Sequence, residues 1–181
     1  MTVVTLQNRA TIADLLKMPD DGYKHELVDG QIVVSPAGFR HSEIAARIAF
    51  IVATYLENSP IGKVYSADVG VLFPNGNLRS PDVTFVRNEK LPDGISPEGF
   101  GEVIPDLAVE VLSPGDSMRH VAQKIGEFLE MGVPLVWLVD PKRESVTVYR
   151  SLSDTEQCGM DDTIDGGTVL PGFSSRVSRF F

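Results

Sequence analysis

Residues 104–117 read IPDLAVEVLSPGDS, and their central part is typical of a strand that is buried on both faces. Apolar side chains fill both sets of alternating positions from Leu107 to Leu112, with one exception, the carboxylate of Glu110. An ionised carboxylate in a sheet interior is unfavourable by several kcal/mol unless its charge is compensated. The candidates for this compensation are a metal ion, a cationic side chain and water at the end of the strand.

This strand opens a strand–helix–strand unit. The pattern predicts a helix over 117–131 that ends at Gly132, because helices commonly carry a glycine just past their last turn. A second buried strand is expected over 134–139. Two strands joined by a helix in this way form a parallel pair with a right-handed crossover. The unit therefore predicts the parallel part of a sheet.

Upstream of this unit, the sequence predicts a short helix, a hairpin and a long helix. Thr11 is expected to cap the short helix, over 11–18. An Asp-Gly pair at 29–30, between two β-prone runs, is a strong hairpin signal. Steps of three and four between apolar residues predict the long helix over 41–57, with one face formed by Ile44, Ile48, Ile51, Val52, Tyr55 and Leu56.

The remaining segments predict further strands and complete the fold class. Strands are expected within 63–73, over 83–86 and over 145–149, and the earlier ones are expected to form an antiparallel meander. We therefore predict an α/β (α+β) fold, with a mixed central β-sheet flanked by helices and an N-terminal β-hairpin. A chain of 181 residues fits a single domain over residues 1–181.

Composition narrows the classes of function. The chain is 43% hydrophobic and 23% charged, which is ordinary for a soluble globular protein. Its single cysteine, Cys158, rules out an internal disulfide, no segment has the length of an apolar membrane span, and residues 1–7 do not resemble a signal peptide. We therefore expect a cytoplasmic protein with no membrane partner.

The net charge of −9 bears on nucleic acid as a partner. Binding to DNA or RNA over a broad surface requires clustered lysine and arginine. The acidic excess therefore disfavours such binding, but it leaves room for a localised basic groove and for a cation site.

Two carboxylates are expected at neighbouring strand ends. Asp82 follows Pro81 at the start of one predicted strand, and Glu110 lies near the end of another. Oxygen ligands of this kind suit a hard divalent cation such as Mg²⁺, with water or a substrate phosphate completing its coordination. The structural alternatives are that Asp82 caps a turn and that Glu110 pairs with an arginine. The apolar flanks of Glu110 favour a functional role for this residue.

Lys124 borders the buried face of the predicted helix over 117–131. It comes three residues after Val121 and four before Phe128, which belong to the inward stripe. Its stem can lie along apolar surface with the amine in water, as lysines at helix edges often do. Alternatively the amine points across the strand–helix unit at Glu110, as a charge partner and a candidate catalytic group.

Several ordered motifs resemble the Uma-type restriction endonuclease family, which belongs to the PD-(D/E)xK nuclease superfamily. They are RSPDV at 79–83, VEVLSP at 109–114, Lys124 and GVPLVWLVDP at 132–141, together with Tyr23, ELVDG at 26–30 and His41 in the N-terminal part. The resemblance covers about residues 11–173, nearly the whole chain. The combination and order of the motifs are specific, although each motif alone is weak.

The resemblance implies a restriction-endonuclease-like core of one helix, three strands, a second helix and a further strand. It also implies an endonuclease that hydrolyses phosphodiester bonds of DNA with Mg²⁺, or Mn²⁺, as its cofactor. Asp82 and Glu110 are then the two acidic residues of the motif and hold the metal with the backbone carbonyl of Val111. The superfamily lysine would stand two positions after Glu110, where this chain has Leu112. Lys124 matches the position on the following helix to which the family has moved it.

Glu26 and His41 are the remaining matches, and each has two interpretations. Glu26 is either a further catalytic carboxylate that enters the site from the hairpin or an exposed hairpin residue. His41 either binds a substrate phosphate at the start of the long helix or forms a structural hydrogen bond to the hairpin.

Three hypotheses follow for the chain as a whole. The first is a Mg²⁺-dependent endonuclease acting on DNA, expected to be a homodimer because nucleases that cut both strands often are. The second is a nuclease-like fold that no longer cleaves and serves as a binding or assembly module, for which Leu112 and the charge of −9 argue. The third is that Glu110 and Lys124 are only a buried ion pair, whose truncation destabilises the fold by about 3–5 kcal/mol.

Overall fold

The structure is a computed structural model that describes residues 9–19, 21–35, 38–66 and 69–181. Residues 1–8 lie outside these ranges, and with them the segment on which the expectation of no signal peptide depends. Of the helices within the described ranges, none is long and apolar enough to cross a membrane.

The elements follow one another closely along the chain. The α-helices are α1 (Ile12–Leu15), α2 (Phe39–Asn58) and α3 (Met118–Glu130), and the 3-10 helices are η1 (Asn88–Lys90), η2 (Pro92–Gly94) and η3 (Val177–Phe180). The strands are β1 (Lys24–Val28), β2 (Gln31–Ser35), β3 (Gly62–Ser66), β4 (Val71–Leu72), β5 (Leu78–Arg79), β6 (Val83–Arg87), β7 (Leu107–Val111), β8 (Leu135–Asp140), β9 (Ser145–Tyr149), β10 (Thr155–Cys158), β11 (Thr163–Gly166) and β12 (Leu170–Arg176). The three predicted helices are confirmed, and the first is a single turn behind the Thr11 cap.

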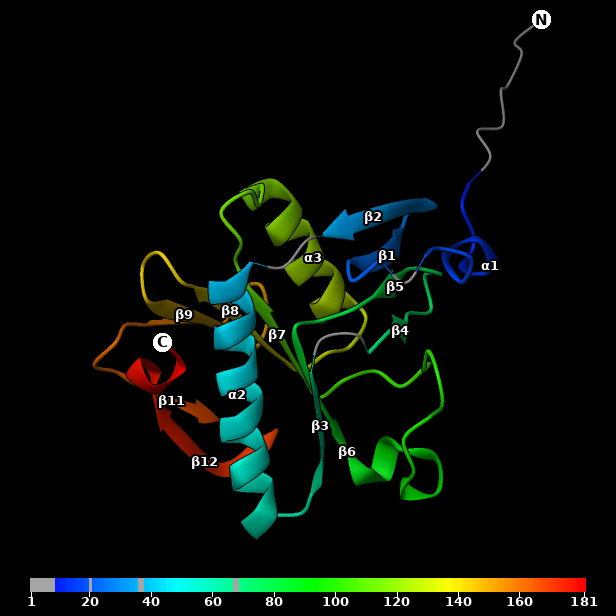
Figure 1. The fold of residues 1–181 in the computed structure, drawn as a ribbon. Coiled ribbons are helices and arrows are strands. Elements are labelled where there is room, and N and C mark those ends of the chain that lie inside the picture. The colour runs from blue at the N-terminus through cyan, green and yellow to red at the C-terminus, as the bar shows by residue number, and fades with distance from the viewer. Residues whose placement is uncertain (1–8, 20, 36–37, 67–68) are drawn as a thin grey trace, which may run out of the picture.

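The central sheet has six strands in the order β10-β9-β8-β7-β6-β3 (Figure 1). β7 and β8 run parallel, with Leu107 opposite Leu135, and the other neighbouring pairs in this sheet are antiparallel. The mixed central sheet is therefore confirmed, as is the parallel pair joined through α3. The order α2, β3, β6, β7, α3, β8 also reproduces the core that the family resemblance implies.

Helices cover both faces of the central sheet. One face packs on α2, η3 and the β11–β12 pair, around a cluster of buried side chains that includes Val109 and Phe180. Trp137 belongs to this layer and stacks on Phe180 with 6.0 Å between the ring centroids, as expected for a core residue. The opposite face packs on α3, where Phe128 fills a second apolar layer. Val109 faces α2. Because side chains alternate along a strand, its neighbour Glu110 points to the opposite face, toward α3.

A second, smaller sheet carries the hairpin, in the order β2-β1-β5-β4. The hairpin is confirmed, and it turns at Asp29 and Gly30 with positive φ angles of 51° and 76°, which an Asp-Gly pair adopts readily. Leu15 of α1 packs with Leu27 and Leu78 against this sheet. The expectation of an antiparallel meander is wrong, because the strands divide between two sheets. β3 and β6 join the central sheet, whereas β4 pairs with β5 and β5 pairs with β1 of the hairpin.

The chain passes from the smaller sheet to the central one across three residues, which we call the seam. β5 ends at Arg79, β6 begins at Val83, and the linking residues are Ser80, Pro81 and Asp82. The seam therefore places Asp82 next to side chains from both sheets.

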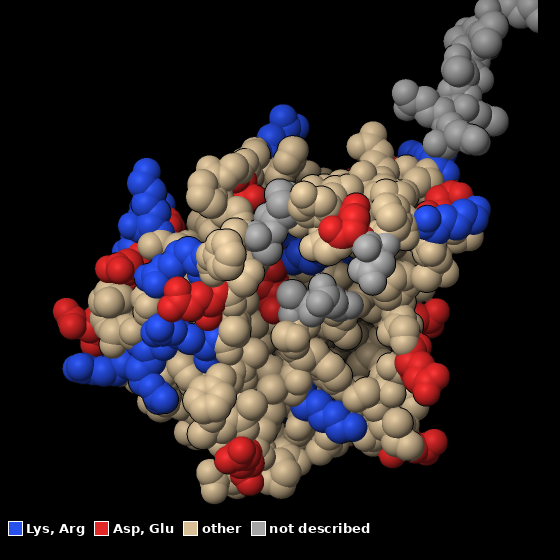
Figure 2. Space-filling view, viewed as in Figure 1, with Lys and Arg blue, Asp and Glu red and all other residues tan. Residues whose placement is uncertain are grey.

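The surface has no uniform charge on the face drawn in Figure 2. Basic side chains gather on the left of this view, mixed with acidic ones, and the lower right edge is acidic. This distribution agrees with the net charge of −9.

Candidate active site

A cleft of about 610 Å³ opens along the seam. It is lined from the hairpin, the first turn of α2, the seam, the end of β7 and the first half of α3. The charged or acid–base side chains on its walls are Lys24, Glu26, Asp29, His41, Arg79, Asp82, Glu110, Asp116, His120 and Lys124. All the side chains that the sequence predicts for the site therefore meet in this one cleft.

Asp82 is the most buried of these side chains, with 1% of its surface exposed. Its Oδ2 accepts a hydrogen bond from the backbone N–H of Val111 at 2.8 Å, and its Oδ1 accepts one from Lys24 Nζ at 2.6 Å. His41 Nε2 lies 3.0 Å from Oδ2. Burial alone would raise the pKa of Asp82, but the hydrogen bond from His41 and the charge of Lys24 outweigh it and hold the pKa well below its usual range. Because these partners come from β7, β1 and α2, Asp82 joins the elements around the cleft and does not cap a local turn.

Glu110 stands beside Asp82 in the paired strands. Val83 pairs with Val109 in the antiparallel register of β6 and β7. Asp82 comes just before Val83 and Glu110 just after Val109, so in this antiparallel register the two lie opposite each other, on the same face of the sheet. Lys124 Nζ lies 2.8 Å from Glu110 Oε1, so of the two orientations left open for this lysine its amine takes the one across the strand–helix unit. The partner of Glu110 is thus a lysine and not an arginine.

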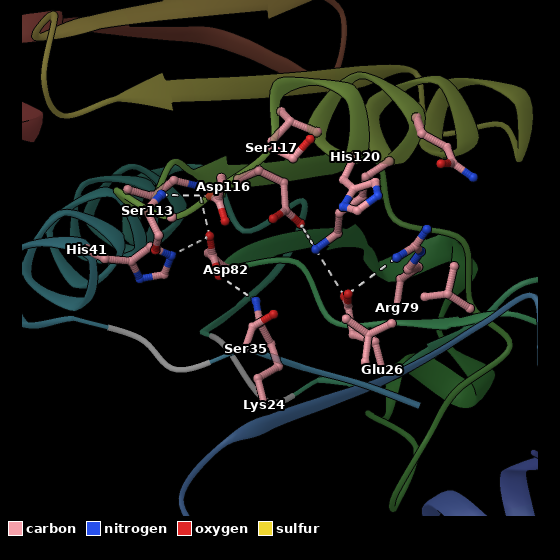
Figure 3. A pocket seen from close by; sticks show the side chains of 18 of the residues that line it. Lys24, Glu26, Ser35, His41, Arg79, Asp82, Ser113, Asp116, Ser117 and His120 are labelled. Carbon is pink, nitrogen blue, oxygen red and sulfur yellow. Dashed lines mark hydrogen bonds and ion pairs between the residues drawn. The ribbon is translucent and has the colours of Figure 1, made fainter. Parts of the chain in front are cut away.

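Glu26 enters the cleft from β1 and is only 4% exposed, so its interpretation as an exposed hairpin residue is wrong. Its Oε1 lies 3.0 Å from Lys124 Nζ and accepts a hydrogen bond from the backbone N–H of Ser80 at 2.8 Å. Arg79 Nη1 lies 3.4 Å from Oε2 (Figure 3). Burial opposes ionisation of Glu26, but Lys124, the Ser80 N–H and Arg79 together lower its pKa. Glu26 and Glu110 therefore share one ammonium group.

Burial and the shared ammonium of Lys124 act in opposite directions on the pKa of Glu110. Desolvation raises the pKa of Glu110 to about 7, and the ammonium of Lys124 reverses only part of this effect. Desolvation also opposes the charge of Lys124, but Glu110, Glu26 and Asp82 together raise the pKa of Lys124 above its usual value. Lys124 thus stays charged, while the carboxylate of Glu110 receives only a share of its charge. Oε1 of Glu110 is the oxygen that faces this ammonium, at 2.8 Å from Lys124 Nζ.

His41 lies in the first turn of α2 and contacts Asp82. The hydrogen bond to Asp82 raises the pKa of His41, although partial burial opposes its charge. The expected structural bond therefore goes to the seam and not to the hairpin. In Figure 3, His41 and Lys24 reach Asp82 from different sides.

A further group of hydrogen bonds holds Arg79 in place. Glu127 of α3 accepts hydrogen bonds from Arg79 Nε at 2.7 Å and from Asn75 Nδ2 at 2.9 Å, and it also accepts one from Asn77. Burial opposes the charge of Glu127, but the two asparagine side chains and Arg79 lower its pKa below the ordinary value. Glu127 therefore joins α3 to the smaller sheet and fixes Arg79 beside Glu26.

Glu127→Gln should lower the free energy of unfolding by about 1–3 kcal/mol at neutral pH, because a buried acceptor of several hydrogen bonds loses its charge. The folded-state pKa of Glu127 lies below 4.5, its ordinary value, so its contribution is complete above that pH and is lost as the pH falls through the folded-state pKa. Chemical denaturation at neutral pH and at about pH 3 measures this difference. The exposed Glu130 on the same helix gives the matched control, Glu130→Gln. A gap between Glu127→Gln and wild type that is equal at both pH values would contradict the prediction.

The chain is similar to known proteins in both sequence and fold. The model of the Uma2 family, described as "Putative restriction endonuclease", matches residues 12–178. The chain belongs to the Uma2 family. A solved structure from Anabaena variabilis, described as "a putative nuclease belonging to DUF820", is similar with a TM-score of 0.82 and 23% identity, over 94% of this chain and 97% of that one. This likeness confirms the fold class. The comparison with curated proteins gave no match.

The donors of the Uma2 cleft suit a hard divalent cation. Asp82 and Glu110 offer carboxylate oxygens on one face of adjacent strands, and Oε1 of Glu110 already faces the Lys124 ammonium at 2.8 Å. Over the ranges that the structure describes, no three His, Cys, Asp or Glu side chains converge closely enough to hold a metal by themselves. A cation here would therefore keep water or substrate oxygens among its ligands, as Mg²⁺ usually does. The backbone of Val111, whose carbonyl is the third expected ligand, is held to Asp82 through its N–H.

Two basic residues of the Uma2 site, Lys24 and Arg79, are missing from the set that the sequence predicts. Lys24 stands two positions before Glu26 on β1, so both side chains point to the same face of the strand, and this spacing is the signal that could have revealed it. Arg79 opens the RSPDV motif, but its contact with Glu26 depends on the smaller sheet. No local pattern announces that pairing.

Proposed function

We propose that the chain is a metal-dependent endonuclease that hydrolyses phosphodiester bonds of DNA. The observation that carries the proposal is the position of Asp82 and Glu110 on one face of adjacent strands, with Lys124 2.8 Å from Glu110 in the same cleft. Membership of the Uma2 family supports the reaction class.

Asp82 and Glu110, with the backbone carbonyl of Val111, would hold Mg²⁺ or Mn²⁺. Such a cation, when bound, would supply a more acidic water as nucleophile and positive charge against the scissile phosphate. Glu26 is the further carboxylate of the site, and its contact with Lys124 at 3.0 Å sets the position of that ammonium.

Lys124 takes the role of the lysine in the PD-(D/E)xK motif, whose usual position is occupied here by Leu112. Its ammonium is held by Glu110 at 2.8 Å and by Glu26 at 3.0 Å, which fixes it on the cleft wall. A charged group in this partly desolvated place orients the attacking water or stabilises charge that develops on the phosphate. Its raised pKa keeps Lys124 protonated at neutral pH, so it donates hydrogen bonds and does not act as a general base.

His41 is the candidate for substrate binding. Its imidazole lines the cleft and is held by Asp82 at 3.0 Å. The hydrogen bond to Asp82 raises the pKa of His41 and so favours the imidazolium form. A positive charge in the cleft attracts the phosphate of a nucleic-acid strand.

The face of the molecule drawn in Figure 2 carries side chains of both charges. With a net charge of −9, affinity must come from local contacts at the cleft and from the metal, since the whole-molecule field opposes binding. Cleavage of both strands of a duplex requires two sites, and a homodimer is the form that would supply them.

Metal removal tests this function directly. The purified chain should nick supercoiled DNA with Mg²⁺ or Mn²⁺, lose this activity in EDTA and regain it when the metal is restored. Glu110→Gln should abolish the cleavage, because it removes one charged ligand at nearly constant size. Glu43→Gln, on the exposed side of α2 outside the cleft, is the control and should cleave like wild type.

Two results would contradict the proposal in different ways. Cleavage that persists in EDTA would overturn the metal dependence. Failure to cleave double- or single-stranded DNA with either metal would overturn the nuclease activity itself.

A second candidate is a nuclease-fold module that binds or assembles but does not cleave. It is favoured by Leu112 and by the partners of Asp82, whose oxygens already face Lys24, His41 and the Val111 N–H. Calorimetric titration with Mn²⁺ separates the two candidates, because a working site should bind the cation and a vestigial one should not.

A further inference from the structure

Lys24 makes an interaction that the proposed reaction does not use. From β1, its Nζ donates hydrogen bonds to Asp82 Oδ1 at 2.6 Å and to the carbonyl of Ser80 at 2.8 Å. Its side chain is 15% exposed and lines the cleft, and Figure 3 shows it reaching Asp82 from the hairpin. Lys24 is therefore a fixed and largely desolvated cation, bound to the most buried carboxylate of the site.

This ammonium occupies the oxygen that a metal would need. Oδ2 of Asp82 already faces the Val111 N–H and His41, which leaves Oδ1 as the oxygen open to a cation. Mg²⁺ lies about 2.0–2.1 Å from its oxygen ligands, so a cation on Oδ1 would meet the Lys24 ammonium with strong repulsion. The two positive charges therefore compete for one oxygen.

The charges of the cleft single out Lys24. Three carboxylates face three fixed cations: Glu26, Asp82 and Glu110 against Lys24, Arg79 and Lys124. Arg79 contacts both Glu26 and Glu127, and Lys124 contacts both Glu26 and Glu110. Among the carboxylates of the described residues, Lys24 contacts only that of Asp82. Its release therefore frees a metal ligand and breaks the fewest ion pairs.

We propose that Lys24 is a built-in competitor of the divalent cation at Asp82 and that metal binding displaces it. The inference rests on the proposed metal-dependent function and adds a residue that sets the metal affinity of the site. Without metal, Lys24 neutralises Asp82 and keeps the cleft assembled. Because the entering ion must replace this bond, the site selects cations of high charge density over monovalent ones.

Calorimetric titration of the full chain with manganese chloride tests the competition. Lys24→Met removes the ammonium and should tighten Mn²⁺ binding about tenfold or more. Lys24→Gln should also tighten it, while Lys24→Arg keeps the charge and should leave the affinity close to that of wild type. Lys90→Met is the matched control, because Lys90 pairs at 2.9 Å with the buried Asp106 outside the cleft. Its removal should not change the Mn²⁺ affinity.

Thermal unfolding gives a second measurement that separates competition from a purely structural contact. Lys24 stabilises Asp82 only while the metal is absent, so Mn²⁺ should raise the melting temperature of Lys24→Met by more than it raises that of wild type. Lys90→Met should lower the melting temperature equally with and without Mn²⁺.

The outcomes distinguish this inference from the proposed function. Unchanged or weaker Mn²⁺ affinity in both Lys24→Met and Lys24→Gln, with wild type still binding, would overturn the role of Lys24 and leave the nuclease proposal intact. Absence of Mn²⁺ binding in wild type and both variants would overturn the two together. Binding by the variants alone would show that Lys24 blocks the site, and it would overturn the inference that the metal displaces Lys24 in the natural chain.

Discussion

Replacing Asp82 by asparagine should reduce the rate of DNA cleavage by about 1,000-fold or more, even at saturating Mg²⁺. The substitution removes one of the two charged ligands of the proposed metal site. It keeps the size of the side chain and an oxygen that can accept the Val111 N–H, which is now 2.8 Å away. The loss would therefore come from missing charge at the metal position. Initial rates on supercoiled DNA, measured while Mg²⁺ is titrated, give the size of the effect.

Asp106→Asn is the matched control for this prediction. Asp106 is another buried aspartate, 5% exposed, and it precedes β7 at the end of the strand away from the cleft. It accepts a hydrogen bond from the N–H of Arg87 at 2.9 Å and pairs with Lys90. Both substitutions should lower the melting temperature, but only Asp82→Asn should stop cleavage. Cleavage by Asp82→Asn at the wild-type rate would show that Asp82 is not a ligand of the proposed metal site.

Replacing Lys124 by methionine should have two large effects. Cleavage should fall by about 100-fold or more, because no other ammonium contacts both Glu110 and Glu26 in the described chain. The free energy of unfolding should also fall by about 3–5 kcal/mol, because two buried carboxylates lose their shared partner. Glu110 can escape this penalty by binding a proton, and its pKa is already about 7. The part of the destabilisation due to Glu110 should therefore be present above about pH 7 and fade below it.

A double-mutant cycle separates the two effects of Lys124→Met. Adding Glu110→Gln neutralises the uncompensated carboxylate and should recover part of the lost stability. Cleavage should stay lost, because the ammonium and one metal ligand are both absent. If Glu110 and Lys124 are only a structural ion pair, each single variant should cleave normally at temperatures where it remains folded.

The surroundings of Glu110 could be predicted because their signals are local. Alternation and length indicate β7 and β8, and the helix pattern between them ends at Gly132, which has the positive φ of 92° that a terminal glycine tolerates. Helix periodicity alone places Lys124 at the border of the buried face, and the structure brings it to Glu110. The position of Asp82 beside Glu110 follows from strand pairing, which the order of the motifs anticipates.

The extension of the predicted hairpin into a four-stranded sheet by β5 and β4 could not be predicted in this way. β4 and β5 have two residues each, which is too short for any periodicity, and they are ordered by pairing with each other and, through β5, with the hairpin. The contacts of Glu26 with Arg79 and of Asp82 with Lys24 depend on that pairing. Arg79 is 53 positions from Glu26, and Lys24 is 58 positions from Asp82. Both contacts are consequences of tertiary packing.

The seam divides the site between two layers of the molecule. The central sheet holds Asp82 and Glu110 at the entry of β6 and near the end of β7, whereas the smaller sheet contributes Lys24, Glu26 and Arg79. Under the proposed function, substitutions in the hairpin would change the cations that face the carboxylates, while the strands next to Asp82 and Glu110 would stay as they are. Under that proposal, the affinity of the cleft for a metal ion could change through one hairpin alone, with the six-stranded sheet left intact.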